Sequence, residues 1–381
     1  MTSISIAGGR KISPRSESIP LPRIAFYTIG DRQTPSTWFR VIQYLPALAR
    51  CGWGFRHFEL PSPVGSGIMQ SLGIFWQGAV RFSQLREARD YDILFVQKGL
   101  TSWRCRGLVD SLRSANKPYV VDIDDAVYLT EFSVQFPSFL QKLQNDAEPI
   151  ELLRHASHVI TGNSFLAAFA QKYNSRVTLI PTPIDTERFS ISSTAATSGD
   201  GKVVLGWSGS AGTNFYFNLL APVFAELAKK YPLLKIRVIS NTKNRIELSK
   251  FEGVRLEFVS WRREREVEDL GKIDIGVMPL EDNEWARGKC GFKALLYMAL
   301  GIPPVCSAVG VNTEIIEDGV NGFLAHDHEE WIEKLSRLIE NPDLRKKMGL
   351  AARKTVEEKY SLAVNMPKWF GVLKTVLERG A

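Results

Sequence analysis

Short apolar runs separated by stretches of helical spacing recur along most of the chain. In the first half the runs are "RIAFYT", "YDILFVQ", "KPYVVDI", "ASHVITGN" and "RVTLIPTP". In the second half they are "KVVLGW", "KIRVIS", "VRLEFV", "IDIGVMPL" and "IPPVCS". Between the runs, apolar residues lie three or four apart, as Val41, Tyr44, Leu45 and Leu48 do in "STWFRVIQYLPALARCGW". This alternation predicts an α/β fold with parallel sheets covered by helices on both faces.

The character of the sequence changes near residues 189–201, where "FSISSTAATSGDG" is small, polar and contains glycine, as linkers do. A length of 381 residues accommodates two αβ domains of similar size on either side of this point. The predicted organisation is a flexible tail at 1–21, a first domain at 22–190, a linker at 191–201, a second domain at 202–362 and a C-terminal helix at 363–381.

Composition excludes few classes of protein. A charged fraction of 23% and a hydrophobic fraction of 44% favour a folded chain, and the net charge of +7 is compatible with nucleic acid, anionic membranes or phosphate-bearing substrates. The four cysteines are scattered without zinc spacing, so we expect no metal site, no disulfide framework and a reducing cytosol. No apolar run reaches transmembrane length, and the first residues lack the apolar core of a signal peptide. We therefore expect a cytoplasmic protein.

Three cations gather at the start of "KCGFKALLYMALGIPPVCS". Lys289 and Lys293 are four residues apart, which predicts one helical face, and Arg287 lies just upstream. The N-terminal end of a helix already carries partial positive charge, so these cations repel one another and the helix dipole. A solvated basic face is one interpretation. We favour an anion site, because a bound diphosphate converts the repulsion into attraction.

A second candidate anion site follows "KVVLGW", where a strand turns into a helix. Small residues at such a turn let backbone N–H groups approach a phosphate. A tight turn capped by Thr213 or Asn214 is the alternative interpretation. The residues predicted to contact the anion are Ser208, Gly209, Ser210 and Thr213.

Carboxylates follow the third apolar run, in "KPYVVDIDDAVY". Ligands of open parallel sheets bind beyond the carboxyl ends of strands, which is where Asp124 and Asp125 fall, two and three residues after Asp122. These carboxylates could contact a substrate hydroxyl, hold a divalent cation, or cap the following turn. We leave the three interpretations open, with substrate contact favoured.

Polar residues also follow the run "PPVCS" and the first strand. Two interpretations of Glu314 stay open. It contacts the polar part of a ligand, or it complements the dipole of the helix that begins there. The further donor-side candidates in this loop are Asn312 and Thr313. The acceptor-side candidates after the first strand are Gly30, Asp31 and Arg40. For Arg40, an ordinary surface or interface arginine is the alternative.

An apolar stripe runs through "GIMQSLGIFWQGAVRFSQLR" from Ile68 to Val80. Such a stripe usually faces a core. With Arg81 and Arg86 nearby, it is also compatible with a helix that lies on an anionic membrane surface.

The stretch "GKCGFKALLYMALGIPPVCSAVGVNTEIIEDGVNGFLA" resembles the signature of the retaining GT-B glycosyltransferases called family 4. That signature reads E-G-F-G-x-P-x-x-E-A-M-A-x-G-x-P-V-V, followed by V-G-G-x-x-E-I-I-x-D-G-x-N-G-x-L. The match is close from Tyr297 to Ala325, and "DIDDAVY", "ITGNSFLAAFAQKY" and "IPTPIDTERF" are similar to N-domain segments of a subgroup. The resemblance extends over nearly the whole chain from Arg23. It implies two Rossmann-like domains, a cleft between them and a C-terminal helix that crosses back to the N-terminal domain.

The chain departs from the family at several positions. Gly288 and Leu296 stand where the family has two glutamates, the second of which contacts the nucleotide ribose. The family's arginine and lysine after the first strand of the second domain are also missing here. Lys293 matches a lysine three residues before the second glutamate in related GT-B enzymes, so we expect the diphosphate contacts at Lys289 and Lys293. Asp124 falls where many members have a histidine.

The resemblance implies a glycosyltransferase that uses a UDP- or GDP-sugar as donor, retains the anomeric configuration and requires no metal cofactor. The predicted catalytic residues are Asp124, Asp125 and Lys293. The expected acceptor is a polysaccharide, a lipid-linked saccharide or another cell-envelope sugar, reached at the inner face of the cytoplasmic membrane.

Three other interpretations stay open. A catalytically inactive sugar-nucleotide-binding protein is compatible with Gly288 and Leu296. A nucleic-acid-binding protein is compatible with the charge, but the bases are interspersed with acids and no RNA or DNA module is legible, so we expect no nucleic-acid partner. A metal-dependent, single-domain glycosyltransferase that uses "DID" leaves the second half of the chain unexplained.

Overall fold

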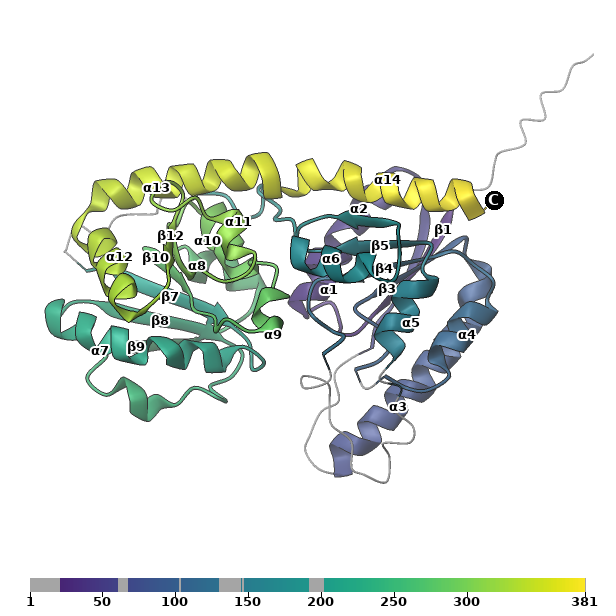
Figure 1. The fold of residues 1–381 in the computed structure, drawn as a ribbon, viewed down its shortest axis with the longest axis horizontal. Helices are drawn as coiled ribbons and strands as arrows, with labels where there is room; N and C mark the ends of the chain where they lie inside the picture. The colour runs from purple at the N-terminus through teal and green to yellow at the C-terminus, as the bar shows by residue number, and fades with distance from the viewer. Residues whose placement is uncertain are drawn as a thin grey trace, which may run out of the picture.

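The computed structural model describes residues 21–60, 68–102, 104–129, 145, 147–191 and 202–380. The predicted tail, except residue 21, and the predicted linker, except residue 191, lie outside these ranges. Within them the chain forms two six-stranded parallel sheets, one in each half of the sequence (Figure 1). Each sheet has an apolar cluster on both faces, so the predicted α/β fold is confirmed.

The N-terminal sheet has the strand order β2-β1-β3-β4-β5-β6. Its strands are β1 (Arg23–Thr28), β2 (Gly54–Phe58), β3 (Ile93–Gln97), β4 (Tyr119–Ile123), β5 (His158–Thr161) and β6 (Val177–Leu179). The helices around it are α1 (Pro35–Arg40), α2 (Leu45–Arg50), α3 (Ile68–Leu85), α4 (Leu108–Ser114), α5 (Glu148–His155) and α6 (Ser164–Gln171). Leu94 and Val96 pack into one core, whereas Ile93 and Phe95 pack into the other, as expected for a strand buried on both faces.

The C-terminal sheet has the strand order β12-β11-β10-β7-β8-β9. Its strands are β7 (Val204–Gly209), β8 (Lys235–Ser240), β9 (Leu256–Ser260), β10 (Ile275–Met278), β11 (Pro304–Ser307) and β12 (Phe323–Ala325). Its helices are α7 (Ala221–Lys230), α8 (Glu266–Leu270), α9 (Glu284–Arg287), α10 (Phe292–Ala299), α11 (Asn312–Ile315), α12 (His328–Glu340) and α13 (Pro342–Thr355). Val277 packs on one face of this sheet and Met278 on the other.

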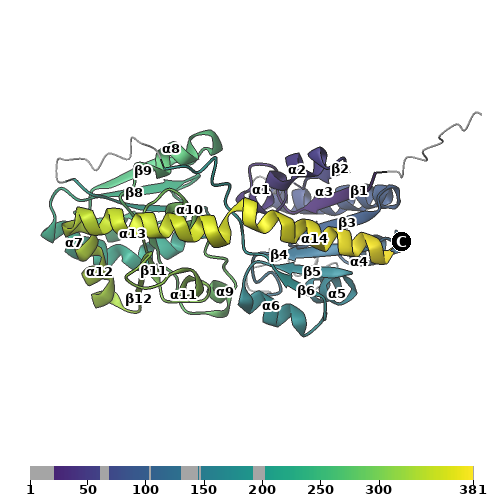
Figure 2. The same cartoon turned by 90° about the horizontal axis from the view of Figure 1, so that it is seen from above.

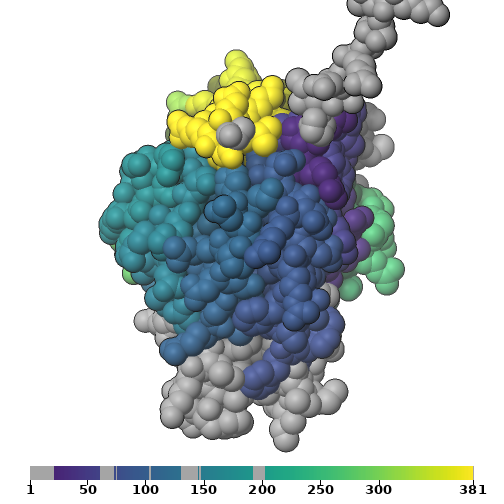
Figure 3. Space-filling view, turned by 90° about the vertical axis from the view of Figure 1, so that its right-hand side faces the viewer, coloured from purple at the N-terminus to yellow at the C-terminus, as the bar shows by residue number. Residues whose placement is uncertain are grey.

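Helix α14 (Leu362–Gly380) follows the C-terminal domain and crosses back to the N-terminal sheet, as predicted. Figure 2 shows α13 and α14 running one after the other across both halves, and Figure 3 shows the end of α14 (yellow) against the N-terminal domain. Trp369 stacks on Tyr44 with 4.5 Å between ring centroids and on Phe26 with 6.1 Å. The last helix is therefore part of the N-terminal core.

A stretch whose helical spacing the sequence shows without a break is interrupted in the structure. Helix α1 ends at Arg40, Val41 leaves the helical conformation with φ −131°, and α2 begins only at Leu45. Pro46 lacks the N–H that a continuous helix needs, so a new helix starts there. Pro222 has the same position at the start of α7, after a 3₁₀ segment at Asn214–Leu220.

Candidate functional site

A cavity of about 280 Å³ lies between the two domains. Its N-terminal wall is formed by residues that follow β1, β3 and β4, and its C-terminal wall by residues that follow β7 and begin α10. Both sheets thus direct the carboxyl ends of strands at one space, the usual place for a ligand in parallel sheets. The charged residues of its lining are Lys98, Asp124, Asp125, Lys289 and Lys293.

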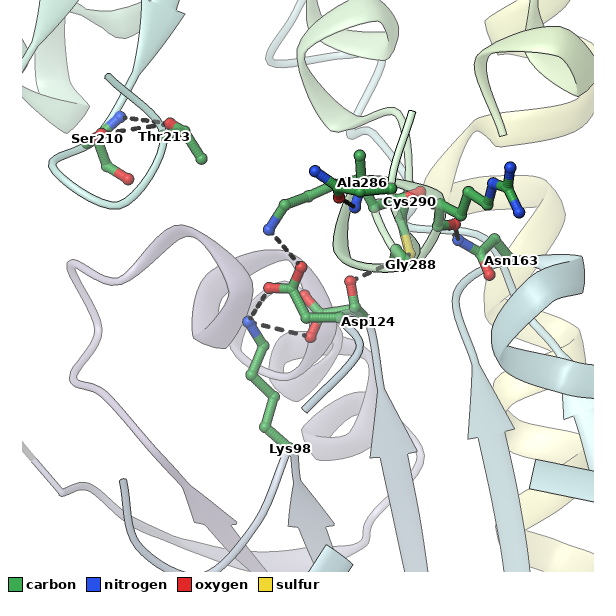
Figure 4. Close-up of polar contacts among 12 residues, drawn as sticks. Lys98, Asp124, Asn163, Ser210, Thr213, Ala286, Gly288 and Cys290 are labelled. Carbon is green, nitrogen blue, oxygen red and sulfur yellow. Dashed lines mark hydrogen bonds and ion pairs between the residues drawn. The ribbon is translucent and has the colours of Figure 1, made fainter. Parts of the chain in front are cut away.

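Asp125 is held between two lysines, one from each domain. Its Oδ2 accepts a hydrogen bond from Lys98 Nζ at 2.8 Å and its Oδ1 accepts one from Lys289 Nζ at 2.7 Å (Figure 4). Burial opposes ionisation of this carboxyl, but the charges of Lys289 and Lys98 hold its pKa well below the ordinary value. Burial likewise lowers the pKa of Lys98, but Asp124 and Asp125 raise it by more. The three groups form an ionised bridge between the domains.

Asp124 lies beside this bridge and lines the cavity. Its Oδ1 accepts a hydrogen bond from Gln97 Nε2 at 3.2 Å and lies 3.4 Å from Lys98 Nζ. Its backbone carbonyl accepts a hydrogen bond from the thiol of Cys290, in the other domain, at 3.2 Å (Figure 4). A carboxylate held in this way can accept a hydrogen bond from a hydroxyl group in the cavity.

Lys289 and Lys293 do not share a helical face, which corrects the sequence prediction. Helix α9 ends before Lys289, and α10 begins only after Gly291. Gly291 has a φ of +66°, a left-handed conformation that interrupts the helix and that other residues rarely adopt. Freed from α10, Lys289 reaches Asp125 and lies over the ring of Trp285, 3.9 Å from its centroid.

Lys293 lies in the first turn of α10 and lines the cavity. Its Nζ lies 5.5 Å from the centroid of the Trp207 ring, and it makes no ion pair with any carboxylate in the part of the chain that the structure describes. Burial and, to a lesser degree, the charge of Lys289 lower the pKa of this amine to about 7. The cavity therefore contains an amine with no carboxylate partner among the described residues, and a bound anion would raise its pKa and favour its charged form.

Arg40 lies beneath the cavity and not at its surface. Only 1% of the residue is exposed, and its guanidinium donates to both carboxylate oxygens of Asp122, at 2.9 and 2.7 Å. The remaining nitrogen donates to the carbonyl of Ile180 at 2.8 Å. The prediction that Arg40 faces an acceptor is therefore wrong: α1 turns the side chain inward, where it neutralises a carboxylate of β4.

The turn after β7 exposes fewer backbone donors than predicted. The N–H of Ser208 donates to the hydroxyl of Tyr297 at 2.9 Å, and the N–H of Ser210 donates to Thr213 Oγ1 at 3.1 Å. Of the four residues predicted here, all of which the structure describes, Ser210 lines the cavity and Ser208, Gly209 and Thr213 do not. Figure 4 shows this turn set apart from the lysine–aspartate bridge.

Two further donor-side candidates point away from the cavity. Arg287 pairs with Asp282 at 2.7 Å in an exposed position. Asn312 is fully buried and donates to the carbonyl of Ser307 at 3.1 Å. The prediction that Asn312 contacts the donor substrate is therefore wrong for this structure. Its side chain instead links the start of α11 to the end of β11.

The last two donor-side candidates are exposed and lie outside the cavity lining. Thr313 donates to the carbonyl of Gly310 at 2.8 Å, which closes the turn before α11. Glu314 accepts a hydrogen bond from the hydroxyl of Ser164, in the N-terminal domain. Glu314 thus links the two domains in this structure.

Gly30 and Asp31 shape the turn that leads into α1. Gly30 has a φ of +121°, and a Cβ there would lie 2.6 Å from Thr34 Oγ1. Asp31 Oδ1 accepts hydrogen bonds from the N–H groups of Gln33 and Thr34, at 2.9 and 3.0 Å. Thr34 lines the cavity, so this turn positions part of the N-terminal wall.

Helix α3 is anchored by Arg81, the arginine that the membrane-surface interpretation placed beside the apolar stripe. Arg81 is fully buried and donates to the carbonyls of Thr28 and Leu100, at 2.7 and 2.8 Å. Earlier in α3, Phe75 is 37% exposed and Trp76 is 56% exposed. Arg81 therefore cannot face a membrane, although an apolar part of α3 does face solvent. None of the described helices is long and apolar enough to cross a membrane.

The sequence analysis missed three residues that build the site. Lys98 directly follows β3, so the rule used for Asp124 would have found it. Asn163 donates to the backbone carbonyls of Arg287 and Lys289, at 3.2 and 2.9 Å, and so holds the loop before α10 from the other domain. No sequence pattern marks Cys290 as a site residue, because its contact with Asp124 forms only when the two domains pack together.

In the described ranges, no group of three or more His, Cys, Asp and Glu residues is arranged to hold a metal ion. The carboxylates nearest the cavity are engaged with basic side chains, Asp122 with Arg40 and Asp125 with Lys98 and Lys289. Substrate contact by Asp124 stays a prediction, and its carboxylate lies at the cavity surface.

Residues 202–341 match the family model described as glycosyl transferases group 1. Spore coat protein SA of Bacillus subtilis (strain 168) is 33% identical over 66 residues, which cover 16% of this chain and 18% of that protein. Trehalose synthase of Pyrococcus horikoshii is 32% identical over 76 residues, which cover 20% of this chain and 18% of that protein. The chain thus spans less than a fifth of each of these relatives.

Solved structures are similar over most of the chain. Sucrose-phosphate synthase from Thermosynechococcus elongatus has a TM-score of 0.74 at 16% identity and covers 94% of this chain and 100% of that one. HepE from Anabaena, solved in complex with UDP and glucose, has a TM-score of 0.67 at 14% identity and covers 93% of this chain and 99% of that one. At these identities the likeness shows the fold, which is GT-B: two Rossmann-like domains that face one another.

Proposed function

We propose that this chain, whose residues 202–341 form a glycosyl transferases group 1 domain, transfers a sugar from a nucleotide-diphosphate sugar to an acceptor in the cavity between its domains. One observation carries the proposal. Lys293 presents an amine without a carboxylate partner among the described residues at the N-terminal turn of α10, and Asp124 lines the same cavity from the opposite domain. A departing diphosphate needs such an amine in its charged form, and a reacting sugar or acceptor hydroxyl needs such a carboxylate.

In this proposal the C-terminal domain stabilises the diphosphate leaving group. Cleavage of the donor bond develops positive charge on the sugar and negative charge on the diphosphate. Lys293 stabilises this negative charge together with the free N–H groups at the start of α10. Lys289 contributes once the donor draws it from Asp125, so the lysine exchanges one anionic partner for another.

The N-terminal domain holds the acceptor side. Asp124 orients a hydroxyl of the sugar or of the acceptor, and Asp125 keeps Lys98 and Lys289 at the edge of the cavity. Retention of configuration belongs to the proposal through the family resemblance. The chemistry assigned to these residues uses no metal ion, because charge stabilisation is assigned to lysines.

A UDP-sugar is the first donor to test, because HepE was solved with UDP and glucose. For the acceptor we propose a saccharide or lipid-linked sugar of the cell envelope, with peripheral contact at an anionic membrane. The exposed side chains of Phe75 and Trp76 on α3 support such contact. A cytoplasmic location at the inner membrane face is part of the same proposal.

A sugar-nucleotide-binding protein without activity is the second candidate, and two positions favour it. Leu296, at the family's second glutamate, is 2% exposed in the C-terminal core and cannot reach a ribose. Gly288, at the first, has no room for a side chain, because a Cβ would lie 2.6 Å from the Cβ of Ala126. Ribose recognition therefore needs other groups in this chain.

Turnover of UDP-sugars by the wild type and by Lys293→Ala tests the proposal. Loss of a contact worth about 3 kcal/mol in the transition state lowers the rate on the order of a hundredfold. The melting temperature should stay unchanged or rise, because a poorly solvated charge is removed. Lys293→Arg should restore only part of the rate, since a planar fork does not reproduce a point charge.

Lys374→Ala, at an exposed position of α14, is the matched control and should keep full activity. Full activity of Lys293→Ala with an unchanged melting temperature would remove this lysine from the mechanism. If UDP raises the melting temperature of the wild type but no UDP- or GDP-sugar is turned over, the binding protein is the correct interpretation.

A further inference from the structure

A second cavity, of about 630 Å³, opens at the other end of the N-terminal domain, where β4, β5 and β6 begin. The ends of α4, α5 and α14 surround it. Figure 3 looks onto this end of the molecule, with the end of α14 in yellow above the blue and teal segments that carry the rest of the lining. Since the strands are parallel, this cavity and the one beside Asp124 lie at opposite ends of the sheet.

The charged lining of this second cavity is entirely basic among the described residues. It consists of Arg113, Lys117, His155, Arg176 and Arg379, which we call the basic cleft. No aspartate or glutamate of the described chain belongs to the lining. A concave surface of one sign of charge focuses the electrostatic potential and attracts the opposite charge.

Helix dipoles explain part of this charge. Arg113, His155 and Arg379 lie in the last turns of α4, α5 and α14, where a helix end carries about half a negative charge. The three ends together supply about −1.5 elementary charges. The three arginines and Lys117 supply four positive charges at neutral pH. An excess of about two and a half positive charges therefore remains.

Neighbouring acids do not remove this excess. Asp110 is 4.0 Å from Arg113, with 84% of its side chain exposed, so the pair is weak. Lys117, Arg176 and Arg379 make no ion pair with any carboxylate in the described ranges. These three cations thus line the cleft without a carboxylate partner in this part of the chain.

The positive potential of the cleft acts on His158, the first residue of β5. Burial lowers the pKa of His158, and the charges of Arg379 and Arg176 lower it further. These two arginines come from segments far apart in the sequence, α14 and the loop before β6. Their fields therefore converge on the start of β5, next to Ser157 of the lining, which is what an anion site requires.

We propose that the basic cleft binds the phosphomonoester group of a small molecule, at a site separate from the donor cavity. Such a group carries about −1.5 to −2 charges at pH 7 and three acceptor oxygens, which matches the excess charge. Arginine guanidinium groups bind phosphate oxygens in pairs, and Arg176 and Arg379 supply two of them. The cleft is concave and has room for more than a phosphate, which favours a soluble ligand over a flat lipid surface.

Calorimetric titration of the full chain with inorganic phosphate, at ionic strength held constant with sodium chloride, tests the proposal. The double variant Arg176→Gln/Arg379→Gln should bind phosphate about tenfold or more weakly, because it lacks both charge-assisted partners. Lys293→Ala, which alters only the donor cavity, should bind phosphate at the cleft with unchanged affinity. This separates the cleft from the proposed transferase site, whether or not that site is active.

The matched control is Arg50→Gln/Lys374→Gln, which removes the same charge from exposed positions outside the cleft and should bind as the wild type does. Melting curves without phosphate verify folding, and Lys117→Gln/Arg176→Gln serves if the first variant is unstable. Equal affinity of the wild type and both cleft variants would overturn the proposal. So would loss of all phosphate binding in Lys293→Ala.

Sedimentation with phosphatidylcholine vesicles that contain phosphatidic acid distinguishes the source of the phosphate. The wild type and the cleft variant should sediment to the same extent, because the ligand is a soluble molecule. Sedimentation that depends on Arg176 and Arg379, without affinity for inorganic phosphate, would replace the small molecule by a lipid headgroup and overturn the proposal as stated.

Discussion

The two walls of the interdomain cavity rest on different groups, which we call their foundations. The N-terminal foundation is a buried ion pair, and the C-terminal foundation is a set of apolar side chains. Beneath the N-terminal wall, Arg40 and Asp122 form an ion pair with side chains 1% and 0% exposed. In the C-terminal wall, the amine of Lys293 lies 5.5 Å from the ring of Trp207, which belongs to the apolar core beneath it. A carboxylate flanked by two lysines stays ionised, whereas a lysine over apolar side chains loses its proton more readily. Lys289 and Lys98 therefore hold the pKa of Asp125 below its ordinary value, whereas burial and the charge of Lys289 lower the pKa of Lys293 to about 7.

The largest effect is expected from breaking the N-terminal foundation. Asp122→Ala leaves the guanidinium of Arg40 buried without its carboxylate, which should lower the free energy of unfolding by about 3–5 kcal/mol. Urea denaturation measures it. Glu59→Ala breaks the exposed pair with Arg32, whose side chains are 33% and 65% exposed, and should lower stability by less than about 1 kcal/mol. Equal losses in the two variants would show that the buried pair has no special role.

The apolar foundation of the C-terminal wall should be sensitive to size and not to charge. A Cβ on Gly276 would lie 2.2 Å from the ring of Tyr297, which accepts the hydrogen bond of Ser208 N–H. Gly276→Ala should therefore lower the free energy of unfolding by about 1–3 kcal/mol through overpacking. Gly212→Ala is the control, since its Cβ meets no atom within 4 Å. If Gly276→Ala is as stable as the wild type, the wall is less tightly packed than its geometry indicates.

A smaller effect, on pH dependence, sharpens the comparison. Burial lowers the pKa of Lys293 to about 7 in the folded chain, whereas an unfolded lysine titrates near about 10.4. Between these values the unfolded chain binds more protons, so the free energy of unfolding rises with pH. Lys293→Met should lose about 1 kcal/mol of the rise that the wild type shows between pH 7 and 9, allowing for partial exposure of the amine.

Urea denaturation of both proteins at the two pH values measures that rise, with Lys374→Met as the exposed control. An identical rise in the wild type and in Lys293→Met would mean that the amine keeps its ordinary pKa, and the contrast between the two foundations would disappear.

The smallest effect is expected from bringing the two walls together. Donor binding should close the domains slightly about the segment at 191–201, since Lys289 already bridges them through Asp125. Small-angle scattering with a saturating nucleotide sugar should show a lower radius of gyration than without it. An unchanged radius under saturation would count against closure and would favour walls that are fixed before the donor binds.

The hydrophobic pattern predicted most of both sheets but missed one outer strand in each. β2 has a burial pattern in which two central residues are exposed, and β12 has only three residues. Outer strands are covered less than central ones, so their sequences lack the continuous apolar run that marked β1 and β3. The register pairs Phe26 of β1 with His57 of β2, a partner that no local pattern identifies.

Local sequence determined the alternation of strands and helices and the position of Asp124 at a strand end, because these follow from periodicity and from turn residues along a few neighbours. The crossing of α14 was implied only by the family resemblance. Tertiary structure alone decided which charges are free. Arg40 and Arg81 are cations like Lys293 in the sequence, yet packing commits the first two to partners 82 and 53 residues away and leaves the third facing the cavity. The energy of a charge depends on what surrounds it in space, and the surrounding groups come from distant segments that a sequence does not place side by side.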